Sequence, residues 1–265
     1  MEVLASKFAG LALACLALLS PFSVQAEDLA NIKRSGELKF AMSGVYPPFS
    51  SVNEQNELLG FDVDIGTEIA KRIGVKGVAV SNAWDGILAS LLSNKYDAVI
   101  GSMTITPERE KVVDFVGPYY RSGRGVFVAG NSTIQSLADI KGKPVGVILG
   151  ETHEKWAREQ AGWDVHTYKG LPELLIDAKA GRVQAFVLDR VAAAVANKNS
   201  GDGFKQLSVP SLEDETSKSA GAWIGIAIRK NNPELKVAMQ HALDQMMSDG
   251  TYTRISMKWI GRDIR

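Results

Sequence analysis

Two hydroxyl side chains and an arginine lie close together in the segment from Ser102 to Phe115. Ser102 and Thr104 follow the apolar run at positions 98–100, and Arg109 comes five residues after Thr104. A planar guanidinium flanked by hydroxyls and free backbone N–H groups suits a carboxylate, which it can hold through two parallel hydrogen bonds. The segment therefore predicts a binding site for a carboxylate.

The elements around this segment decide where its side chains point. The apolar run at 98–100 predicts a buried parallel strand, and open α/β folds bind their ligands beyond the carboxyl ends of such strands. Thr106 is expected to cap a short helix that begins at Pro107 and carries Arg109 in its first turn. Ser102, Thr104 and Arg109 are therefore predicted to meet at one edge of a sheet.

A partial internal repeat predicts a second unit of the same kind. Residues 87–102 align without gaps on residues 174–189, and both stretches predict a helix, a polar turn and a strand. In this alignment Ser102 and Asp189 are equivalent, each at the carboxyl end of its own strand. We therefore expect two similar lobes that face each other.

Several motifs, in order along the chain, resemble the signature of solute-binding protein family 3, the periplasmic amino-acid-binding subunits of ABC importers. They are Tyr46-Pro-Pro-Phe49, Gly60-Phe-Asp-Val-Asp64, Asn82-Ala-Trp-Asp-Gly86, Thr104-Ile-Thr-Pro-Glu-Arg109, Asp114-Phe115 and Pro118-Tyr-Tyr120. The resemblance implies a bilobal α/β periplasmic-binding-protein fold of type II, with two lobes joined by a hinge of two crossings. Residues 27–120 and 224–265 would form the first lobe, and residues 121–223 the second.

The resemblance also implies roles for individual residues. Tyr46 and Trp84 would form aromatic walls around the ligand, although core packing explains a tyrosine and a tryptophan equally well by residue type. Four residues would hold the ligand carboxylate, and Asp189 would hold its ammonium group. The alternative for Asp189 is a helix N-cap, which is compatible with that role. The four carboxylate contacts are Ser102, Thr104, Arg109 and Thr152, of which Thr152 could instead cap the helix that follows Gly150.

The ligand's side chain is predicted from two further positions. Family members that bind basic amino acids often carry an aspartate where this chain has Ser43, so a neutral polar or medium-sized apolar side chain is expected. Glu151 stands where the family commonly has a small hydroxyl residue. We expect Glu151 to point outward, because an inward carboxylate would approach the ligand carboxylate. If it points inward, it provides an anion for arginine, lysine or an opine-like ligand.

The N-terminal segment predicts export. Residues 1–26 contain Lys7, an apolar run too short to span a bilayer, and small residues at a cleavage site ending at Ala26. The only cysteine, Cys15, lies in this leader, so the exported chain contains no cysteine for a disulfide. The net charge is zero, which gives no support to nucleic acid or an anionic membrane as partner. A periplasmic monomer that docks on an inner-membrane ABC permease is expected.

Two other functions use similar residues. The fold also hosts a periplasmic dehydratase of prephenate or arogenate, but the three histidines show no metal-ligand spacing, and no serine or cysteine nucleophile has an identifiable base. His153, the one nearest the site, is expected to be a solvated residue of a helix start. A sensor that delivers its ligand to a membrane receptor would share the binding chemistry. We expect a binding protein without catalytic residues, metal or cofactor.

Overall fold

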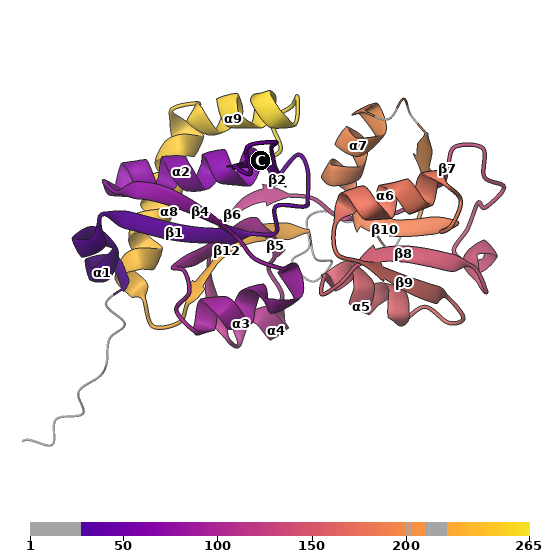
Figure 1. The fold of residues 1–265 in the computed structure, drawn as a ribbon, viewed down its shortest axis with the longest axis horizontal. Coiled ribbons are helices and arrows are strands. Elements are labelled where there is room, and N and C mark those ends of the chain that lie inside the picture. Colours follow the sequence, from indigo (N-terminus) through magenta and orange to yellow (C-terminus); the bar gives the residue numbers. More distant parts are fainter. Residues whose placement is uncertain (1–27, 200, 202, 210–211, 213–221) are drawn as a thin grey trace, which may run out of the picture.

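The protein folds into two α/β lobes that lie side by side (Figure 1). The computed structural model describes residues 28–199, 201, 203–209, 212 and 222–265, so the leader predicted at positions 1–26 lies outside the described residues. Each lobe is built around its own five-stranded sheet. The bilobal fold predicted from the sequence is confirmed.

The sheet of the first lobe has the strand order β4-β1-β5-β12-β6. Strand β1 pairs in parallel with β4 and β5, whereas β12 pairs antiparallel with β5 and β6. The predicted strand at 98–100 is the buried start of β5, at the centre of the sheet. The bounds are β1 Glu37–Met42, β4 Lys76–Ser81, β5 Ala98–Thr104, β6 Val113–Arg121 and β12 Trp223–Arg229.

The sheet of the second lobe has the order β11-β7-β10-β8-β9. Strand β10 pairs in parallel with β8 and antiparallel with β7, so the two sheets have similar but not identical pairing. The helix and strand at 171–189 repeat those at 87–104, as the internal alignment predicts. The bounds are β7 Arg124–Ala129, β8 Pro144–Ile148, β9 Asp164–Tyr168, β10 Ala185–Asp189 and β11 Phe204–Gln206.

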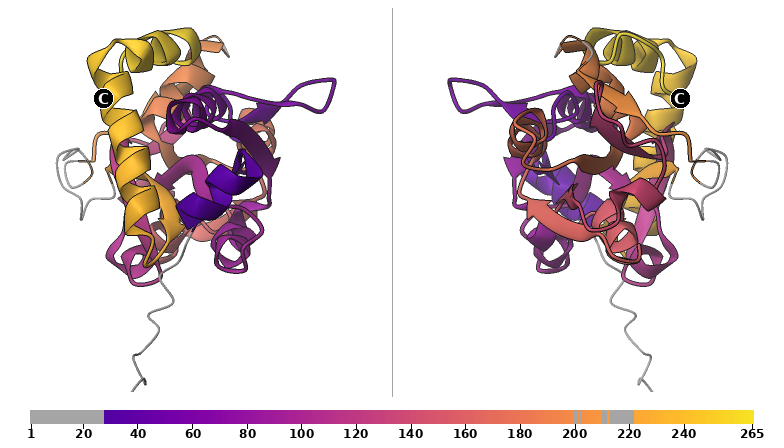
Figure 2. Two further views of the ribbon diagram at one scale, coloured as in Figure 1. Left: turned by 90° about the vertical axis from the view of Figure 1, so that its left-hand side faces the viewer. Right: turned by 90° about the vertical axis from the view of Figure 1, so that its right-hand side faces the viewer.

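Helices cover both faces of the first sheet, with α2, α8 and α9 on one side and α3 on the other (Figures 1 and 2). Figure 2 also shows the short hairpin β2–β3 projecting from the body. In the first lobe the bounds are α1 Asp28–Ser35, β2 Ser51–Val52, β3 Leu58–Leu59, α2 Phe61–Ile73, η1 Trp84–Gly86, α3 Ile87–Leu92, α4 Pro107–Glu110, α8 Pro233–Ser248 and α9 Thr251–Trp259. In the second they are η2 Ala138–Ile140, α5 Thr152–Arg158, α6 Leu171–Lys179 and α7 Arg190–Asn199.

Local sequence accounts for several of these helices. Helix α2 buries an isoleucine every four residues and ends at Gly74, whose left-handed φ of 84° suits glycine. Asp85 lies within the 3₁₀ turn η1, and the helix that follows has no side-chain cap. Val237 is 69% exposed. It lies on the solvent side of α8, between the buried Leu235 and Met239.

Two crossings connect the lobes. Strand β6 ends at Arg121 and β7 begins at Arg124, and the chain returns to the first sheet at Trp223. The crossings lie side by side, because the backbone N–H of Ser122 donates to the carbonyl of Ala222 at 2.9 Å. The lobe boundaries at 121 and 223 stay predictions. At these two points the chain passes from one sheet to the other.

Candidate functional site: a cavity between the lobes

One enclosed cavity lies between the two lobes and receives residues from both. The first lobe contributes side chains from the ends of β5 and β12, the turn η1 and helix α4. The second lobe contributes the start of α5 and the end of β10. The lining residues are Tyr46, Trp84, Ser102, Thr104, Arg109, Tyr120, Glu151, Thr152, His153, Asp189 and Ile224.

A second cavity adjoins the first, and Tyr46, Trp84 and Glu151 line both. Seven of the eight binding residues predicted from the sequence line the first cavity, and the remaining one, Ser43, lines the second. The fold thus brings all of the predicted residues to two cavities that share three lining residues. The other residues of the second cavity are Val45, Gly101, Ile148, Lys169 and Gly170.

Arg109 is held in position by its own helix and by the preceding strand. As predicted, Thr106 caps α4: its side chain accepts a hydrogen bond from the N–H of Arg109 at 3.2 Å. The guanidinium Nη1 donates to the carbonyl of Thr104 at 2.9 Å, and the group lies 5.9 Å from the ring centre of Trp84. Burial lowers the pKa of Arg109, and among the described residues no carboxylate lies within ion-pair distance of it. The site therefore presents an enclosed cation.

Asp189 combines the two roles considered for it. Its Oδ1 accepts hydrogen bonds from the N–H groups of Val191 at 2.8 Å and Ala192 at 3.0 Å, so it caps α7. The side chain also lines the cavity, in a residue that is only 5% exposed. Because the cap fixes the carboxylate, Asp189 presents a preoriented anion from the second lobe, opposite Arg109 of the first.

Ser102 is fixed by a buried network behind the cavity. Its hydroxyl donates to Asp62 Oδ2 at 2.8 Å, and its backbone N–H donates to the hydroxyl of Tyr119 at 2.9 Å. Tyr119 in turn donates to Asp62 Oδ1 at 2.7 Å. Ser102 has a left-handed φ of 59°, which is uncommon for a residue with a side chain. When Asp62 is ionised, the single hydroxyl hydrogen of Ser102 goes to Asp62, and the Ser102 oxygen then offers only lone pairs to a ligand.

The aromatic wall is larger than predicted. Tyr46 stacks on Phe49 with ring centres 5.8 Å apart, and Phe49 stacks on Tyr120 at 5.2 Å. Tyr120 also lines the first cavity, although it is not among the binding residues predicted from the sequence. It belongs to the Pro118-Tyr-Tyr motif, which was the available signal. The stack anchors the cavity wall in the core of the first lobe.

Two expectations about the start of α5 are wrong, and of the two roles considered for Thr152 the structure does not show the helix cap. Glu151 points inward, since it lines both cavities and its side chain is 15% exposed. His153 is buried in the cavity wall rather than solvated. Thr152 is the first helical residue and not the cap; instead, Glu154 accepts a hydrogen bond from the N–H of Gly150 at 2.7 Å. Contact with the opposing lobe encloses this helix start, which the sequence of α5 alone does not reveal.

The lobes are closed over both cavities. The N–H of Leu171 in the second lobe donates to the carbonyl of Val45 in the first at 2.9 Å, and Lys155 lies 3.8 Å from Glu108 across the same gap. Each cavity has a volume of about 10 Å³, which is room for about one water molecule. A larger ligand therefore enters only when the lobes separate or the lining side chains move.

An enclosed cavity with a cation from one lobe and an anion from the other, at a two-crossing hinge, defines the class of bilobal solute-binding proteins. The chain belongs to the bacterial extracellular solute-binding proteins, family 3, whose model matches residues 38–262. The family resemblance found in the sequence motifs is confirmed. Within the described ranges, no group of three metal-ligating side chains occurs, and none of the helices there has the length and apolar character needed to cross a membrane.

Known proteins of the same family are similar along most of their length. The L-cystine-binding protein TcyJ of Escherichia coli K12 is 39% identical over 96% of this chain and 94% of its own. The ABC transporter arginine-binding protein 1 of the same organism is 35% identical over 92% and 96%. These two relatives are binding proteins.

Solved structures are similar in fold as well as sequence. An ancestral arginine-binding protein bound to arginine has a TM-score of 0.76 and 41% identity, covering 85% of this chain and 99% of the other. The ancestral amino-acid-binding protein AncCDT-1, described as a precursor of cyclohexadienyl dehydratase, has a TM-score of 0.79 and 34% identity, covering 88% and 99%.

Proposed function

We propose that this protein is the solute-binding subunit of an amino-acid ABC importer and that it captures an L-amino acid between its lobes. The observation that carries the proposal is the pairing of Arg109 and Asp189 across one enclosed cavity. An α-amino acid has a carboxylate and an ammonium group on one carbon, and the cavity offers one fixed charge for each. Neither lobe alone holds both charges, so binding and closure are coupled.

Arg109 and Asp189 together form an amino-acid clamp, and the hydroxyl residues near them have different roles. Arg109 binds the ligand carboxylate, with Thr104 and Thr152 as further donors in the same cavity. Ser102 acts differently from the sequence prediction, because its hydroxyl hydrogen is used by Asp62. Its oxygen accepts a hydrogen bond from the ligand ammonium, beside Asp189. Tyr46 and Trp84 flank the point where the ligand's side chain leaves the first cavity.

The proposed partner is an ABC permease of the inner membrane, which receives the amino acid from the closed protein. The leader predicted at residues 1–26 supports a periplasmic location, and the family is extracellular by description. The similarity to an ABC transporter arginine-binding protein supports the transport role. We propose that the protein acts as a monomer and uses neither nucleic acid nor a cofactor.

Removing the carboxylate contact tests this function. Arg109→Ala should fold normally but lose most of its amino-acid affinity, because truncating one partner of a buried ion pair costs about 3 to 5 kcal/mol, or on the order of a hundredfold or more. Arg109→Lys should also bind weakly, since it keeps the charge but loses the planar fork. Titration calorimetry of both variants measures the change, with thermal unfolding as the control for folding. Unchanged affinity in Arg109→Ala would refute the assignment.

The other end of the clamp is tested by the ligand's ammonium group. Asp189→Asn should weaken binding of the amino acid far more than binding of its deaminated analogue, since only the former places a cation against Asp189. The same calorimetric titration compares both ligands. Equal losses would mean that Asp189 acts as the α7 cap and not as a ligand contact.

A dehydratase is the second candidate, and one observation favours it. Glu151 is an enclosed acid beside the carboxylate site, and burial together with Asp189 raises its pKa to about 8. A carboxyl group that is protonated at neutral pH is able to act as a general acid. Incubation of the purified protein with prephenate, followed by chromatography, tests this activity. We expect no product to form.

A further inference from the structure

The second cavity is the natural space for the ligand's side chain. It joins the amino-acid clamp at three shared residues, Tyr46, Trp84 and Glu151. A ligand held by its α-carboxylate and α-ammonium in the first cavity can extend past this junction into the second cavity. The inference below therefore rests on the proposed amino-acid clamp, and it concerns what the junction selects.

Glu151 is an acid without a strong partner at this junction. It precedes α5, and within the described part of the chain no hydrogen bond reaches its carboxylate. The nearest basic group is His153 Nε2, 3.9 Å from Glu151 Oε2. Burial, Arg124 and Arg109 lower the pKa of His153 to about 3, so His153 is neutral at physiological pH and forms no ion pair. An enclosed carboxylate in this situation is costly unless another cation approaches.

Other charges around Glu151 do not supply that cation. Arg109 attracts Glu151 from α4, but we assign its guanidinium to the ligand carboxylate. Asp189 repels Glu151 from the end of β10. Lys169 lines the second cavity from the residue after β9, but it is exposed, so water screens its charge. The occupied clamp therefore leaves Glu151 uncompensated.

We propose that Glu151 is a specificity-determining residue that binds a nitrogen cation in the ligand's side chain. The ligand is thus an L-amino acid with a second positively charged group beyond its α-carbon. The aromatic walls Tyr46 and Trp84 beside Glu151 suit such a group, because a guanidinium or ammonium is attracted to the face of an aromatic ring. This inference replaces the neutral side chain expected from the sequence, which depended on an outward Glu151.

Binding of a cation at Glu151 is coupled to the release of a proton. At pH 7 a carboxyl with a pKa of about 8 is about nine-tenths protonated. A cationic ligand requires the ionised form, so its binding to the closed form of the protein releases up to about 0.9 proton at pH 7. The affinity for such a ligand rises as the pH increases from 6 to 8. A neutral ligand does not require the ionised form of Glu151. Asp62, whose pKa is about 7, also titrates in this range, but it affects the binding of both ligands in the same way.

The test compares two nearly isosteric ligands, L-arginine and L-citrulline, which differ in the charge of the distal group. Calorimetry at pH 7 in two buffers of different ionisation enthalpy measures affinity and proton release together. We expect the wild type to prefer L-arginine roughly a hundredfold and to release a proton with it. In Glu151→Gln we expect L-arginine to lose most of this advantage and the proton release to vanish, while the affinity for L-citrulline changes only a few-fold.

Two further variants control this result. Glu159→Gln removes an exposed acid from the residue that follows α5, so it changes the net charge equally but should leave the preference intact. Lys169→Gln separates two sources of the distal cation. It should not affect L-arginine or L-lysine, whereas it should weaken L-cystine, whose second half carries a carboxylate as well as an ammonium group. Either ligand supports the proposal if its binding requires Glu151.

The outcomes that overturn the proposal are separate from failure of the clamp. Equal affinity of the wild type for L-arginine and L-citrulline, or undiminished L-arginine binding by Glu151→Gln, would refute the role of Glu151. A ligand whose binding depends on Lys169 but not on Glu151 would indicate a distal anion and would also refute it. If no α-amino acid binds to the wild type at all, the amino-acid clamp itself is wrong, and both proposals fail.

Discussion

At the scale of single residues, Asp62 controls how Ser102 faces the ligand. Asp62 is fully buried at the start of α2 and accepts hydrogen bonds from Ser102 and Tyr119. Burial raises its pKa to about 7, although these hydrogen bonds oppose the rise. In the sequence, Asp62 appears only as part of the family motif Gly60-Phe-Asp-Val-Asp64. Its contact with Ser102 depends on packing between segments 40 residues apart, which local patterns do not encode.

Replacing this acid should change both stability and binding. In the folded protein Asp62 keeps its proton up to about pH 7, but in the unfolded chain it loses it near pH 4. The folded state therefore binds more protons between these values, and Asp62 lowers stability as the pH rises, by at most about 1.4 kcal/mol per pH unit. Asp62→Asn should remove this contribution from the pH dependence of the free energy of unfolding. It should also weaken ligand binding, because the amide cannot accept both hydrogen bonds.

A matched control lies two residues away. Asp64 is on the same helix, but its carboxylate bonds to Lys258 and Trp259 of α9, away from the cavity. Asp64→Asn should leave the affinity unchanged. Denaturant titrations of both variants at pH 4 to 8, together with calorimetry, make the comparison. If the two variants shift the pH profile equally, Asp62 has no special role.

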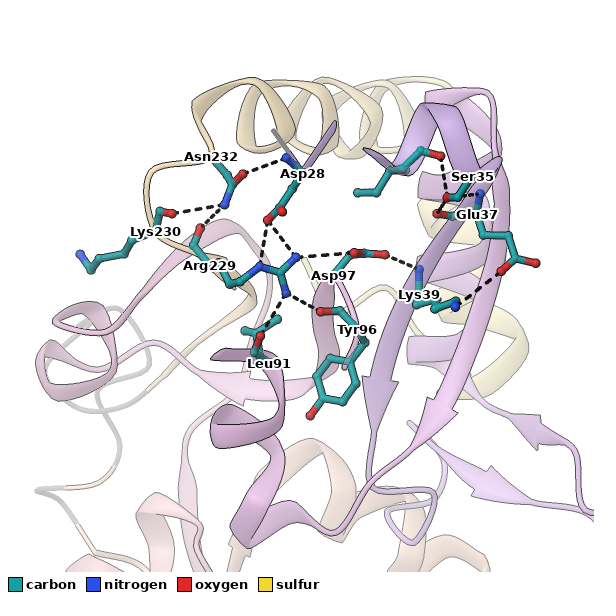
Figure 3. Close-up of polar contacts among 11 residues, drawn as sticks. Asp28, Ser35, Glu37, Lys39, Leu91, Tyr96, Asp97, Arg229, Lys230 and Asn232 are labelled. Carbon is teal, nitrogen blue, oxygen red and sulfur yellow. Dashed lines mark hydrogen bonds and ion pairs between the residues drawn. The ribbon is translucent and has the colours of Figure 1, made fainter. Parts of the chain in front are cut away.

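At the scale of elements, Arg229 joins segments that are distant in the sequence (Figure 3). Its side chain, at the end of β12, is within 2.9 Å of Asp28 at the start of α1 and donates to the carbonyls of Leu91 at 3.0 Å and Tyr96 at 2.5 Å. Asp97, 3.5 Å away, accepts from the N–H of Lys39 in β1. These contacts fasten the returning chain to the first lobe, at residues that do not line either cavity.

Loss of this link should affect stability but not ligand recognition. Arg229→Met keeps the length of the side chain but leaves Asp28 without its partner, in a pair that is 13% and 14% exposed. We expect the free energy of unfolding to fall by about 3 kcal/mol. Denaturant unfolding measures this change, and calorimetry should give the wild-type affinity. A large loss of ligand affinity in Arg229→Met would show that this link also affects the binding site.

The sequence predicted most elements and most of the first cavity, and the exceptions share a physical cause. The cap at Thr106 and the proline that follows it located α4, because these signals lie within one element. The family resemblance assigned the binding residues, from Tyr46 to Asp189. Glu151 and His153 were misplaced because their burial depends on the other lobe. The donor direction of Ser102 was missed because it depends on Asp62.

At the scale of the whole molecule, closure depends on close approach of the two lobes at Gly170. A β-carbon at this position would lie 2.7 Å from the side chain of Val45, which belongs to the opposite lobe. The backbone φ of Gly170 is −155°, which any residue can adopt. The glycine is therefore required by the interface between the lobes and not by its own conformation.

Gly170→Ala should hinder closure without unfolding the protein. Overpacking of this kind costs about 1 to 3 kcal/mol, so we expect affinity to fall roughly 5- to 150-fold. The melting temperature without ligand should hardly change if the ligand-free lobes are apart. The double variant Gly170→Ala/Val45→Gly should recover part of the affinity, because it removes both Val45 side-chain atoms that lie 2.7 Å from the added β-carbon and leaves only the Val45 carbonyl at 2.9 Å. Failure of the second substitution to rescue binding would show that the contact does not limit closure.

The hydrogen bond from Leu171 to Val45 has a consequence for observing the protein at work. It joins two backbone groups, so most side-chain substitutions leave both groups in place. It exists only while the lobes touch, so the exchange of that single amide hydrogen with solvent reports the fraction of closed molecules. The exchange rate of this amide hydrogen therefore measures the opening equilibrium of the lobes without a dye, label or engineered reporter.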